Sequence, residues 1–364
     1  MLYTRIKYIL NIILLPIVFL GCCYAADKKD IKIDIIDFKE IKKSKSNIYI
    51  HSKKDSIYIS SKNKLYAIKK NKILWEKTIS GKISKKISIT KDIIIITTEN
   101  RNILAINPKN GDILWKTKTN DEILSKAKIT NNNIYINTNG NEIIALDKYN
   151  GRLLWNLSID NQDMNLYYGH TPIISKNIIY NIFSNNKLIA IKKENGQLIW
   201  KKKIFKNNNN SITNVIRNSI LYNNKLYINN NSGNLINFDL NDKKVIFEKK
   251  FKEKINININ KENIIITKNN GTIINKDIKT NQNIWKNKEL KNKKLTYPII
   301  FKKNEIIIIG DDIGMIHFIN LNTGKIIKSI KISKYSINKC ISNKDKHIYI
   351  ITNKKHVLYA KIKY

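Results

Sequence analysis

Residues 102–115 read Asn-Ile-Leu-Ala-Ile-Asn-Pro-Lys-Asn-Gly-Asp-Ile-Leu-Trp, and close copies of this segment recur along the chain. Residues 142–155 (EIIALDKYNGRLLW) and residues 187–200 (KLIAIKKENGQLIW) repeat it. In each copy an Ala stands ten residues before the Trp, with an Asn-Gly pair between them. The Ile and Leu residues favour strands, and Asn-Gly supplies the positive φ values of a tight hairpin. Each copy therefore predicts a β-hairpin.

Weaker copies extend the repeat in both directions. An earlier copy ends at Trp75, and later copies place Phe247, Trp285 and Lys328 at the position of the Trp. These positions are 38 to 47 residues apart. All five Trp residues of the chain occupy this one position: Trp75, Trp115, Trp155, Trp200 and Trp285. A period near ~40 residues, built from short strands, is typical of a β-propeller with one blade per repeat.

The number of copies predicts an all-β protein, an eight-bladed β-propeller of four-stranded antiparallel blades. Seven Trp-type positions and a partial unit at residues 347–360 give eight blades. One blade is expected to contain strands at residues 92–97, 102–107, 112–117 and 123–129. The last unit lacks a strand, which residues 31–38 can supply, and this closure covers exposed sheet edges. Residues 31–364 are therefore predicted to form a single domain.

The stripe of Trp residues has two interpretations. It can be a platform for a ligand, or each indole can fill the gap between neighbouring blades and bury its large ring there. The packing interpretation is preferred, because Phe247 and Lys328 replace Trp at two positions of the same ring. The five Trp residues are therefore expected to hold the blades together.

The N-terminus has the three-part layout of a secretory signal peptide. In residues 1–25 a short basic start precedes an apolar run that is too short for a comfortable ~20-residue membrane span. Ordinary cleavage after Ala25 or Ala26 would release a soluble periplasmic protein. This soluble periplasmic form is the alternative to a lipid-anchored protein, which the end of the apolar run suggests.

The end of this run, Leu20-Gly21-Cys22, is similar to the lipobox of bacterial lipoproteins. The similarity implies removal of residues 1–21, acylation of Cys22 with diacylglyceryl and palmitate-type chains, and a linker at residues 22–30. Several acyl chains give stable anchoring. Because Cys23 is not the Asp that retains lipoproteins in the inner membrane, the expected destination is the outer membrane.

The net charge is +39, from 67 Lys and Arg against 28 Asp and Glu. Such a charge is typical of proteins that bind nucleic acid or anionic surfaces. Only four of the basic residues are Arg, whereas Lys, Ile and Asn are all very common. The codons of these three residues are rich in A and T, so an AT-rich genome is the preferred explanation and no nucleic-acid partner is expected. The alternative is a polyanion-binding propeller with its best patch at residues 201–203 and 207–210.

Enzymatic and metal-binding classes find little support. The five His are scattered without metal-ligand spacing, and neither Gly-x-Ser-x-Gly nor a phosphate loop is present. The adjacent pair Asp311 and Asp312 is expected to form a solvated hairpin rather than a calcium site. Cys340 is expected to fill a core position. No catalytic residue, metal or cofactor is predicted.

The unit Ala-x-Asp/Asn followed by Asn-Gly-x-Leu-Leu-Trp resembles the repeat of pyrroloquinoline-quinone (PQQ) propellers. Two families share that repeat: the quinoprotein dehydrogenases and BamB, whose members are eight-bladed lipoproteins of the outer-membrane β-barrel assembly (BAM) machinery. Repeat, lipobox and C-terminal partial blade together resemble the BamB family across essentially the whole chain. The resemblance implies a non-catalytic scaffold without cofactor, lipid-anchored at the outer membrane and facing the periplasm. A PQQ-dependent periplasmic dehydrogenase is the alternative.

The resemblance also implies partners and a contact loop. The expected partners are a BamA-like barrel-forming subunit, bound through its periplasmic POTRA region, and other subunits of the assembly complex, with unfolded outer-membrane proteins as a further candidate. The contact loop corresponds to residues 156–172, and its contact positions fall on Met164, Leu166 and Tyr167. The family's Arg is here Tyr167, which can still serve as an aromatic anchor. In the alternative, the loop folds back and caps its own blade.

A second family contact loop corresponds to residues 201–219. The family carries an acidic pair there, which falls near Asn214 and Ile216 in this chain. Both carboxylates are absent. The resemblance therefore implies an interface that has changed together with its partner, or a weaker contact.

Overall fold

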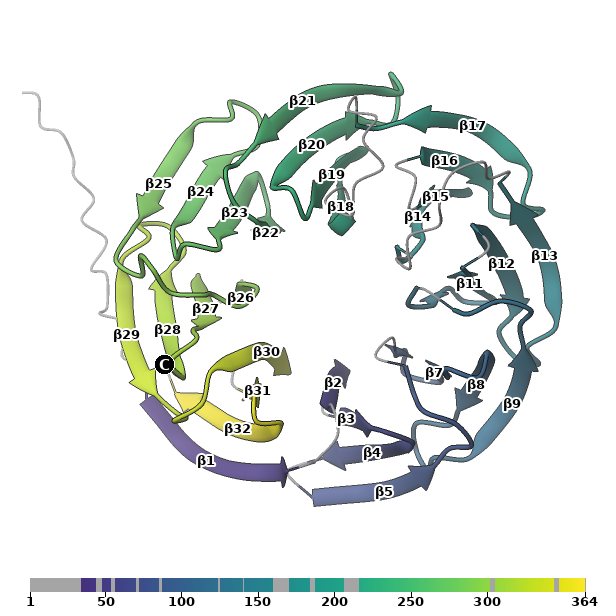
Figure 1. The fold of residues 1–364 in the computed structure, drawn as a ribbon, viewed down its shortest axis with the longest axis horizontal. Helices are drawn as coiled ribbons and strands as arrows, with labels where there is room; N and C mark the ends of the chain where they lie inside the picture. Colours follow the sequence, from purple (N-terminus) through teal and green to yellow (C-terminus); the bar gives the residue numbers. More distant parts are fainter. Residues whose placement is uncertain are drawn as a thin grey trace, which may run out of the picture.

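The computed structural model shows a ring of eight four-stranded antiparallel sheets (Figure 1). It describes residues 34–43, 48–53, 56–69, 72–84, 87–123, 125–139, 141–159, 170–183, 187–205, 216–301, 305–343 and 347–363. The predicted all-β, eight-bladed propeller is confirmed. The stretches of Ile, Val and Tyr form the two middle strands of each blade, where both faces of the strand are covered by neighbouring blades.

The first four blades follow the chain order from the inside of the ring outward. Blade one consists of β2 (Ile48–Lys53), β3 (Ser56–Ser61), β4 (Lys64–Lys69) and β5 (Lys72–Thr78). Blade two consists of β6 (Ser88–Ile89), β7 (Ile94–Thr97), β8 (Asn102–Ile106) and β9 (Ile113–Lys118). Blade three consists of β10 (Lys128–Ile129), β11 (Asn133–Asn137), β12 (Glu142–Asp147) and β13 (Leu153–Ser158). Blade four consists of β14 (Ile173–Ser175), β15 (Ile178–Ile182), β16 (Lys187–Lys192) and β17 (Leu198–Lys203).

The next three blades repeat this order. Blade five consists of β18 (Ile216–Tyr222), β19 (Lys225–Asn230), β20 (Asn234–Asp239) and β21 (Lys244–Lys250). Blade six consists of β22 (Ile255–Asn260), β23 (Asn263–Lys268), β24 (Ile273–Asp277) and β25 (Asn283–Asn287). Blade seven consists of β26 (Ile299–Phe301), β27 (Ile306–Gly310), β28 (Met315–Asn320) and β29 (Ile326–Lys331).

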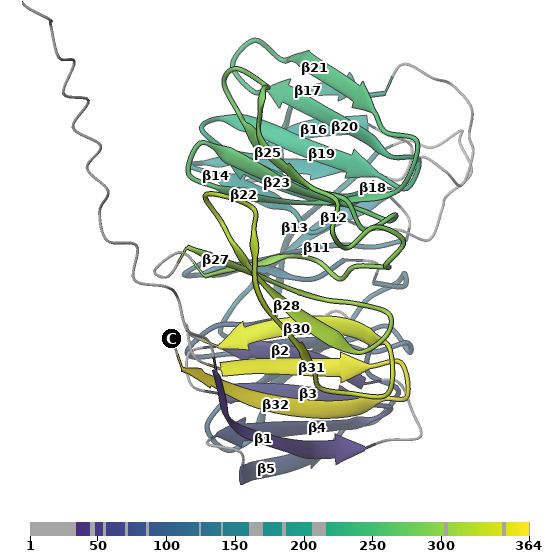
Figure 2. The ribbon, with the colours of Figure 1, turned by 90° about the vertical axis from the view of Figure 1, so that its left-hand side faces the viewer.

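Blade eight joins the two ends of the chain. Its inner strands are β30 (Ile337–Asn343), β31 (His347–Thr352) and β32 (His356–Lys363), and its outermost strand is β1 (Asp34–Lys43). The two terminal strands pair antiparallel and lie side by side in both views (Figures 1 and 2). The expected closure by an N-terminal strand is confirmed, with the strand a few residues later than the predicted 31–38.

The predicted composition of a blade was wrong in one respect. Residues 123–129 were expected to form the fourth strand of the blade that begins at residue 92. The strand in this segment, β10, is instead the innermost strand of the following blade, and β6 takes the innermost place in blade two. After each outermost strand the chain returns to the centre of the ring, so a unit read from residue 92 combines strands of two blades.

The core is divided among the junctions between blades. Among the described residues, eight clusters of buried apolar side chains each combine residues of two consecutive blades. In the cluster that closes the ring, Ile57 and Ile59 of blade one lie with Tyr349 and Val357 of blade eight. The blades are therefore held together by apolar burial at every junction, including the closing one.

The outermost strands carry much of the positive charge. Strands β9, β17 and β21 end in Trp-Lys-Thr-Lys, Trp-Lys-Lys-Lys and Phe-Glu-Lys-Lys, and most of these lysines are exposed. Lysine on an edge strand discourages pairing with another sheet, because the incoming strand would have to desolvate the charge. The Lys-rich rim thus has a structural use that does not require a nucleic-acid partner.

Candidate functional site

The small and the aromatic residue of each repeat face each other across two paired strands. In four blades the paired residues are Ala67 with Trp75, Ala105 with Trp115, Ala145 with Trp155, and Ala190 with Trp200. A β-bulge follows the Ala in each pair. The ten-residue spacing in the sequence is thus the register of a hairpin, in which the small Ala leaves room for the indole opposite it.

Each indole also reaches into the next blade. Trp115 donates its Nε1–H to the carbonyl oxygen of Lys148 in blade three, at 2.9 Å. Gly151 lies under the same ring with φ of +73°, and a Cβ there would come within 2.4 Å of Trp115 Cε3. The same hydrogen bond joins Trp75 to Pro108 (3.1 Å), Trp155 to Lys193 (3.3 Å) and Trp285 to Leu321 (2.8 Å).

The fifth Trp also contacts the next blade, but through a stacked ring instead of a hydrogen bond. Trp200 stacks on Phe238 of blade five, with ring centroids 6.0 Å apart and an interplanar angle of 28°. All five indoles therefore lie at junctions between consecutive blades, where each one bridges two sheets. This arrangement is that of blade-packing side chains, and the Gly of the Asn-Gly turn is needed because a side chain there would collide with the ring.

The two positions without Trp differ from each other. In blade seven Phe318 is paired with Lys328, so the large ring has moved to the strand opposite the usual one. In blade five Asn237 is paired with Phe247, and neither strand carries an indole. Blade seven therefore retains a fully buried phenyl ring, whereas the phenyl ring of Phe247 after blade five is only partly buried.

The residues expected to contact a partner lie outside the described part of the chain. Met164, Leu166 and Tyr167 belong to this group, as do Asn214 and the lipidation site Cys22. The connection from β13 to β14 contains the first three, and the connection from β17 to β18 contains Asn214.

The described ends of these two connections lie together. Nδ1 of His170, just before β14, is 3.5 Å from Oγ of Ser219 on β18. Ile216, near which the family's acidic pair falls, is buried in the core between blades four and five. The strands that follow the two connections, β14 and β18, thus lie near each other in neighbouring blades, while Ile216 itself is not available to a partner.

A hollow of about 800 Å³ lies beside these ends, against the innermost strands. Lys126, Lys128 and Arg217 line it together with His170 and Tyr297, and none of the described residues in its lining carries a carboxylate. Arg217 donates a hydrogen bond to Oδ1 of Asn256 at 2.9 Å and lies 5.9 Å from the centroid of the Tyr297 ring. The hollow is positively charged, which favours anionic groups on whatever approaches this part of the ring.

Further ionisable side chains lie on or beside innermost strands: His51 on β2, Lys339 on β30 and Lys126 just before β10. Burial lowers the pKa of Lys339 to about 8, and the charge of Lys126 contributes to the shift. The pKa of Lys126 itself is lowered by burial. Burial also holds the pKa of His51 well below its usual value, with the charges of Lys126 and Lys339 adding to the effect. This group has no direct signal in the sequence, because its members are scattered over three blades.

The expectation of a solvated hairpin at Asp311 was wrong. Asp311 is fully buried, and its carboxylate accepts hydrogen bonds from the backbone N–H groups of Ile313 and Met315 and lies 3.3 Å from Nε2 of His317. Burial lowers the pKa of His317, and the Asp311 carboxylate opposes that shift. The carboxylate therefore organises a tight turn from inside rather than facing water.

Cys340 occupies the core position that was expected. It is buried and free in the junction between blades seven and eight, and burial raises the pKa of its thiol to about 12. Within the described ranges, no three His, Cys, Asp or Glu residues gather closely enough to hold a metal ion. In the same part of the chain, no helix is long and apolar enough to cross a membrane.

Comparison with known families decides among the propellers that share this repeat. The profile of the family described as outer membrane protein assembly factor BamB matches residues 39–122 and residues 61–287, which together are more than half of the chain. The chain belongs to the BamB family. The family is one of outer-membrane assembly factors and not of enzymes, which sets it apart from the quinoprotein dehydrogenases that share the repeat.

Individual BamB proteins match over shorter stretches. BamB of Shewanella oneidensis is 27% identical over 107 residues, which are 29% of this chain and 27% of that protein. BamB of Moranella endobia is 28% identical over 122 residues, 34% of this chain and 31% of that protein. The matched part of the chain thus spans about a quarter to a third of the length of these relatives.

Solved structures show the same fold over nearly the whole chain. The crystal structure of BamB from Moraxella catarrhalis has a TM-score of 0.72 at 17% identity and covers 91% of this chain and 100% of its own. A quinohemoprotein alcohol dehydrogenase from Pseudomonas putida HK5 has a TM-score of 0.67 at 8% identity, covering 91% of this chain and 76% of its own. At such identities the likeness concerns the fold alone.

Proposed function

We propose that the protein is a non-catalytic scaffold lipoprotein of the BAM complex, which binds the POTRA region of BamA and aids the folding and insertion of outer-membrane proteins. The observation that carries the proposal is the match of the BamB profile over more than half of the chain. The closed ring supports it, because a rigid propeller presents loops of neighbouring blades at fixed distances from one another.

The contact is placed at the two connections β13–β14 and β17–β18. His170, next to the first connection, lies close to Ser219 on the strand that follows the second, which supports a partner that contacts both connections. The positively charged hollow beside them would favour an acidic or anionic surface on that partner. Within the first connection, Met164, Leu166 and Tyr167 supply the apolar and aromatic side chains that usually dominate the energy of a small interface.

Co-purification of the full-length chain with BamA from membranes solubilised in a mild detergent tests this contact. The double change Leu166→Glu and Tyr167→Ala is expected to reduce recovery of BamA at least tenfold, because loss of one anchor costs ~1–2 kcal/mol or more. Tyr149→Ala is the matched control. Tyr149 is 68% exposed in the turn between β12 and β13, at the opposite end of β13 from the β13–β14 connection.

The control is expected to bind as the wild type does, and circular dichroism should show that both variants are folded. If the folded double variant retains wild-type recovery of BamA, the contact lies elsewhere on the ring. If the two variants lose BamA equally, the loss is not specific to the β13–β14 connection.

The anchoring part of the proposal rests on the sequence Leu20-Gly21-Cys22. Cys22→Ala is expected to leave the protein uncleaved or to release it into the soluble fraction, because acyl chains at this residue would hold it at the membrane. Intact-mass measurement of the wild-type protein should show the mass added by acylation at Cys22. A free thiol at that residue would exclude the anchor.

A further inference from the structure

The junction between blades five and six differs in three register positions from the junctions that follow blades one, two and three. Phe247 stands where five blades have Trp, and Asn237 stands opposite it where four of those blades have Ala. In blade six, Asn281 occupies the turn position that holds Gly in blades two, three, four and seven, and it has the same positive φ, 58°. No indole therefore crosses this junction, and Asn281 meets no indole ring at the turn position.

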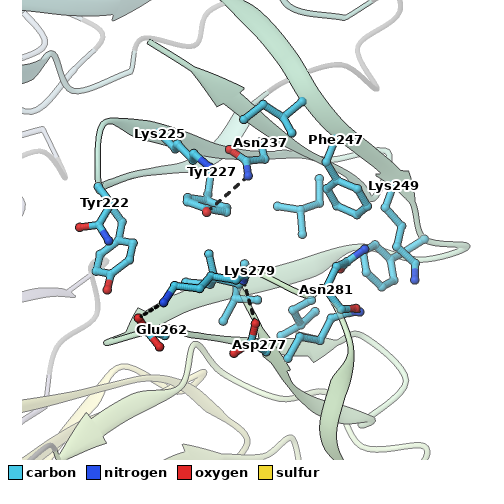
Figure 3. A pocket seen from close by; sticks show the side chains of 18 residues that line it. Tyr222, Lys225, Tyr227, Asn237, Phe247, Lys249, Glu262, Asp277, Lys279 and Asn281 are labelled. Atoms are coloured by element: carbon cyan, nitrogen blue, oxygen red, sulfur yellow. Dashed lines mark hydrogen bonds and ion pairs between the residues drawn. The ribbon is translucent and has the colours of Figure 1, made fainter. Parts of the chain in front are cut away.

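The space left by these changes is a cavity of about 250 Å³ (Figure 3). Its walls are largely aromatic and aliphatic, and they include Tyr222, Tyr227, Phe247, Phe251 and Ile264. The volume lies just below the ~300–1,000 Å³ of typical small-molecule sites, so an occupant would be small. Most of these residues come from β18–β21, from β23 and β24, and from the turn that leads to β25.

A lysine is buried in the wall of this cavity. Lys276 is 6% exposed, and it follows the bulge on β24 at a position that holds an apolar residue in the six other blades with this bulge. Those residues are Ile68, Ile106, Leu146, Ile191, Phe238 and Ile319. Nζ of Lys276 donates a hydrogen bond to the backbone carbonyl of Asn281. Burial, and then the charge of Lys249, lowers the pKa of Lys276.

The carboxylates around the cavity are already engaged. Glu262 forms an ion pair with Lys279 at 2.6 Å, and Asp277 accepts hydrogen bonds from the backbone N–H groups of Lys279 and Thr280. Lys225 and Lys249 add further positive charge to the lining. Among the described residues Lys276 has no ion-pair partner. The cavity therefore has excess positive charge next to an apolar surface.

An amide in the cavity wall also has unused hydrogen-bonding capacity. Nδ2 of Asn237 is 3.4 Å from the hydroxyl oxygen of Tyr227, but its Oδ1 is buried without a hydrogen-bond partner in the described part of the chain. A buried polar atom of this kind is costly unless a donor satisfies it. The site thus offers a cation and an acceptor within walls of aromatic rings.

We propose that this cavity binds a small amphiphilic carboxylic acid, with its apolar body among the aromatic rings and its carboxylate paired with Lys276. Charge complementarity supports this class, because an anion in the cavity would offset the uncompensated charge of the buried lysine. Any hydroxyl donor on the ligand would be directed to Oδ1 of Asn237. The site is at the junction of blades five and six and is independent of the proposed contact with BamA.

Isothermal titration calorimetry on the full-length protein in lipid nanodiscs tests the ligand class with 3-phenylpropanoate and its uncharged analogue 3-phenylpropanamide. The two differ in the charge of the head group and share the apolar body. The carboxylate is expected to bind at least tenfold more tightly than the amide. Equal affinities, or no measurable binding of the carboxylate at millimolar concentration, would overturn the proposal. This comparison uses the wild-type protein and does not depend on any variant being folded.

Two sets of variants place the ligand. Lys276→Met is expected to weaken binding of the carboxylate at least tenfold, whereas Lys286→Met, which removes an exposed positive charge from β25 of the same blade, should leave it unchanged. The pair Phe247→Trp and Asn281→Gly restores the usual junction and should abolish binding by filling the cavity, while Asn281→Gly alone should not. Wild-type affinity in folded Lys276→Met, or in the refilled double variant, would show that the ligand binds elsewhere.

Discussion

The junction between blades two and three and the junction between blades five and six share one strand register but are packed differently. In the first, Trp115 is only 8% exposed, bonds to the backbone of the next blade and rests on Gly151. In the second, Phe247 makes no such bond, Asn281 replaces the glycine, and a cavity with the buried Lys276 remains. The backbone pairing and the bulge are nevertheless the same in both.

The difference shows that the ring does not need an indole at every junction. Apolar clusters centred on the middle strands join all eight junctions, including the three without Trp. The aromatic position is therefore an addition to a junction that is already apolar, and it can be given up locally at the cost of some packing. A cavity can then form without loss of the fold.

The largest expected loss of stability is at the junction that is filled by an indole. Trp115→Ala should destabilise the protein by about 3–5 kcal/mol, because it removes a buried ring and its hydrogen bond to the next blade. Phe247→Ala should cost clearly less, since that ring already borders a cavity. Melting temperatures measured side by side check this order, and equal losses for the two variants would contradict the contrast between the junctions.

A methyl group under the indole should have the next largest effect. Gly151→Ala places a Cβ within 2.4 Å of Trp115 Cε3 at a residue with φ of +73°, so overpacking and backbone strain should together cost ~1–3 kcal/mol. Asn281→Gly, at the equivalent turn of the junction between blades five and six, should change stability by less than ~1 kcal/mol. Denaturant unfolding compares the two. If Gly151→Ala is as harmless as Asn281→Gly, the indole does not lie on the turn.

Lys276→Leu should stabilise the protein, because it restores the apolar residue that the other blades carry at this position. The pKa of Lys276 is lowered in the folded chain, so the charged form is disfavoured there at neutral pH. This penalty fades as pH rises above the folded pKa and approaches the unfolded value. The melting temperature should therefore rise by about 2 °C near pH 7, and by less near pH 10. A variant that melts lower than the wild type at neutral pH would contradict this burial cost.

The smallest effect concerns Lys339, on the innermost strand of blade eight, rather than a junction between blades. Lys339 has a pKa of about 8, so its amine should titrate near that pH, below the ordinary value for a lysine. Since the unfolded chain keeps the proton up to higher pH, stability should rise as pH increases from about 8 toward the unfolded pKa. NMR of ¹³C-methylated lysines can follow the titration of the Lys339 amine. Lys126→Gln should raise the midpoint by removing a neighbouring charge, and an unchanged midpoint would show that the two amines do not interact.

The repeat was sufficient to predict the fold because its spacing is set by the hairpin itself. The ten residues from Ala105 to Trp115 are a cross-strand register, and the number of such units gave the number of blades. The boundaries of a blade could not be read from the repeat, because an inner strand as short as β10 leaves almost no alternating pattern. The burial of Asp311 could not be read either, since Asp is common in both exposed and buried turns.

The candidate sites were predicted less completely. Met164, Leu166 and Tyr167 were chosen by resemblance alone and remain predictions, as does Cys22. The burial of Lys276 was not predicted, because a single lysine in a chain rich in lysine does not stand out in the sequence. Aligning the repeats by their bulges would have shown it, as the only charged residue at its position among the seven repeats that have the bulge.

The proposal that the protein is a scaffold of outer-membrane protein assembly is tested most directly by affinity capture. The full-length wild-type protein would be captured from membranes solubilised in a mild detergent, and its partners identified by mass spectrometry. The expected result is a BamA-type barrel protein with periplasmic POTRA domains in near-stoichiometric amount. Capture of the folded protein without any outer-membrane barrel protein, together with PQQ-dependent dye reduction by the captured material, would contradict the scaffold function and support a dehydrogenase.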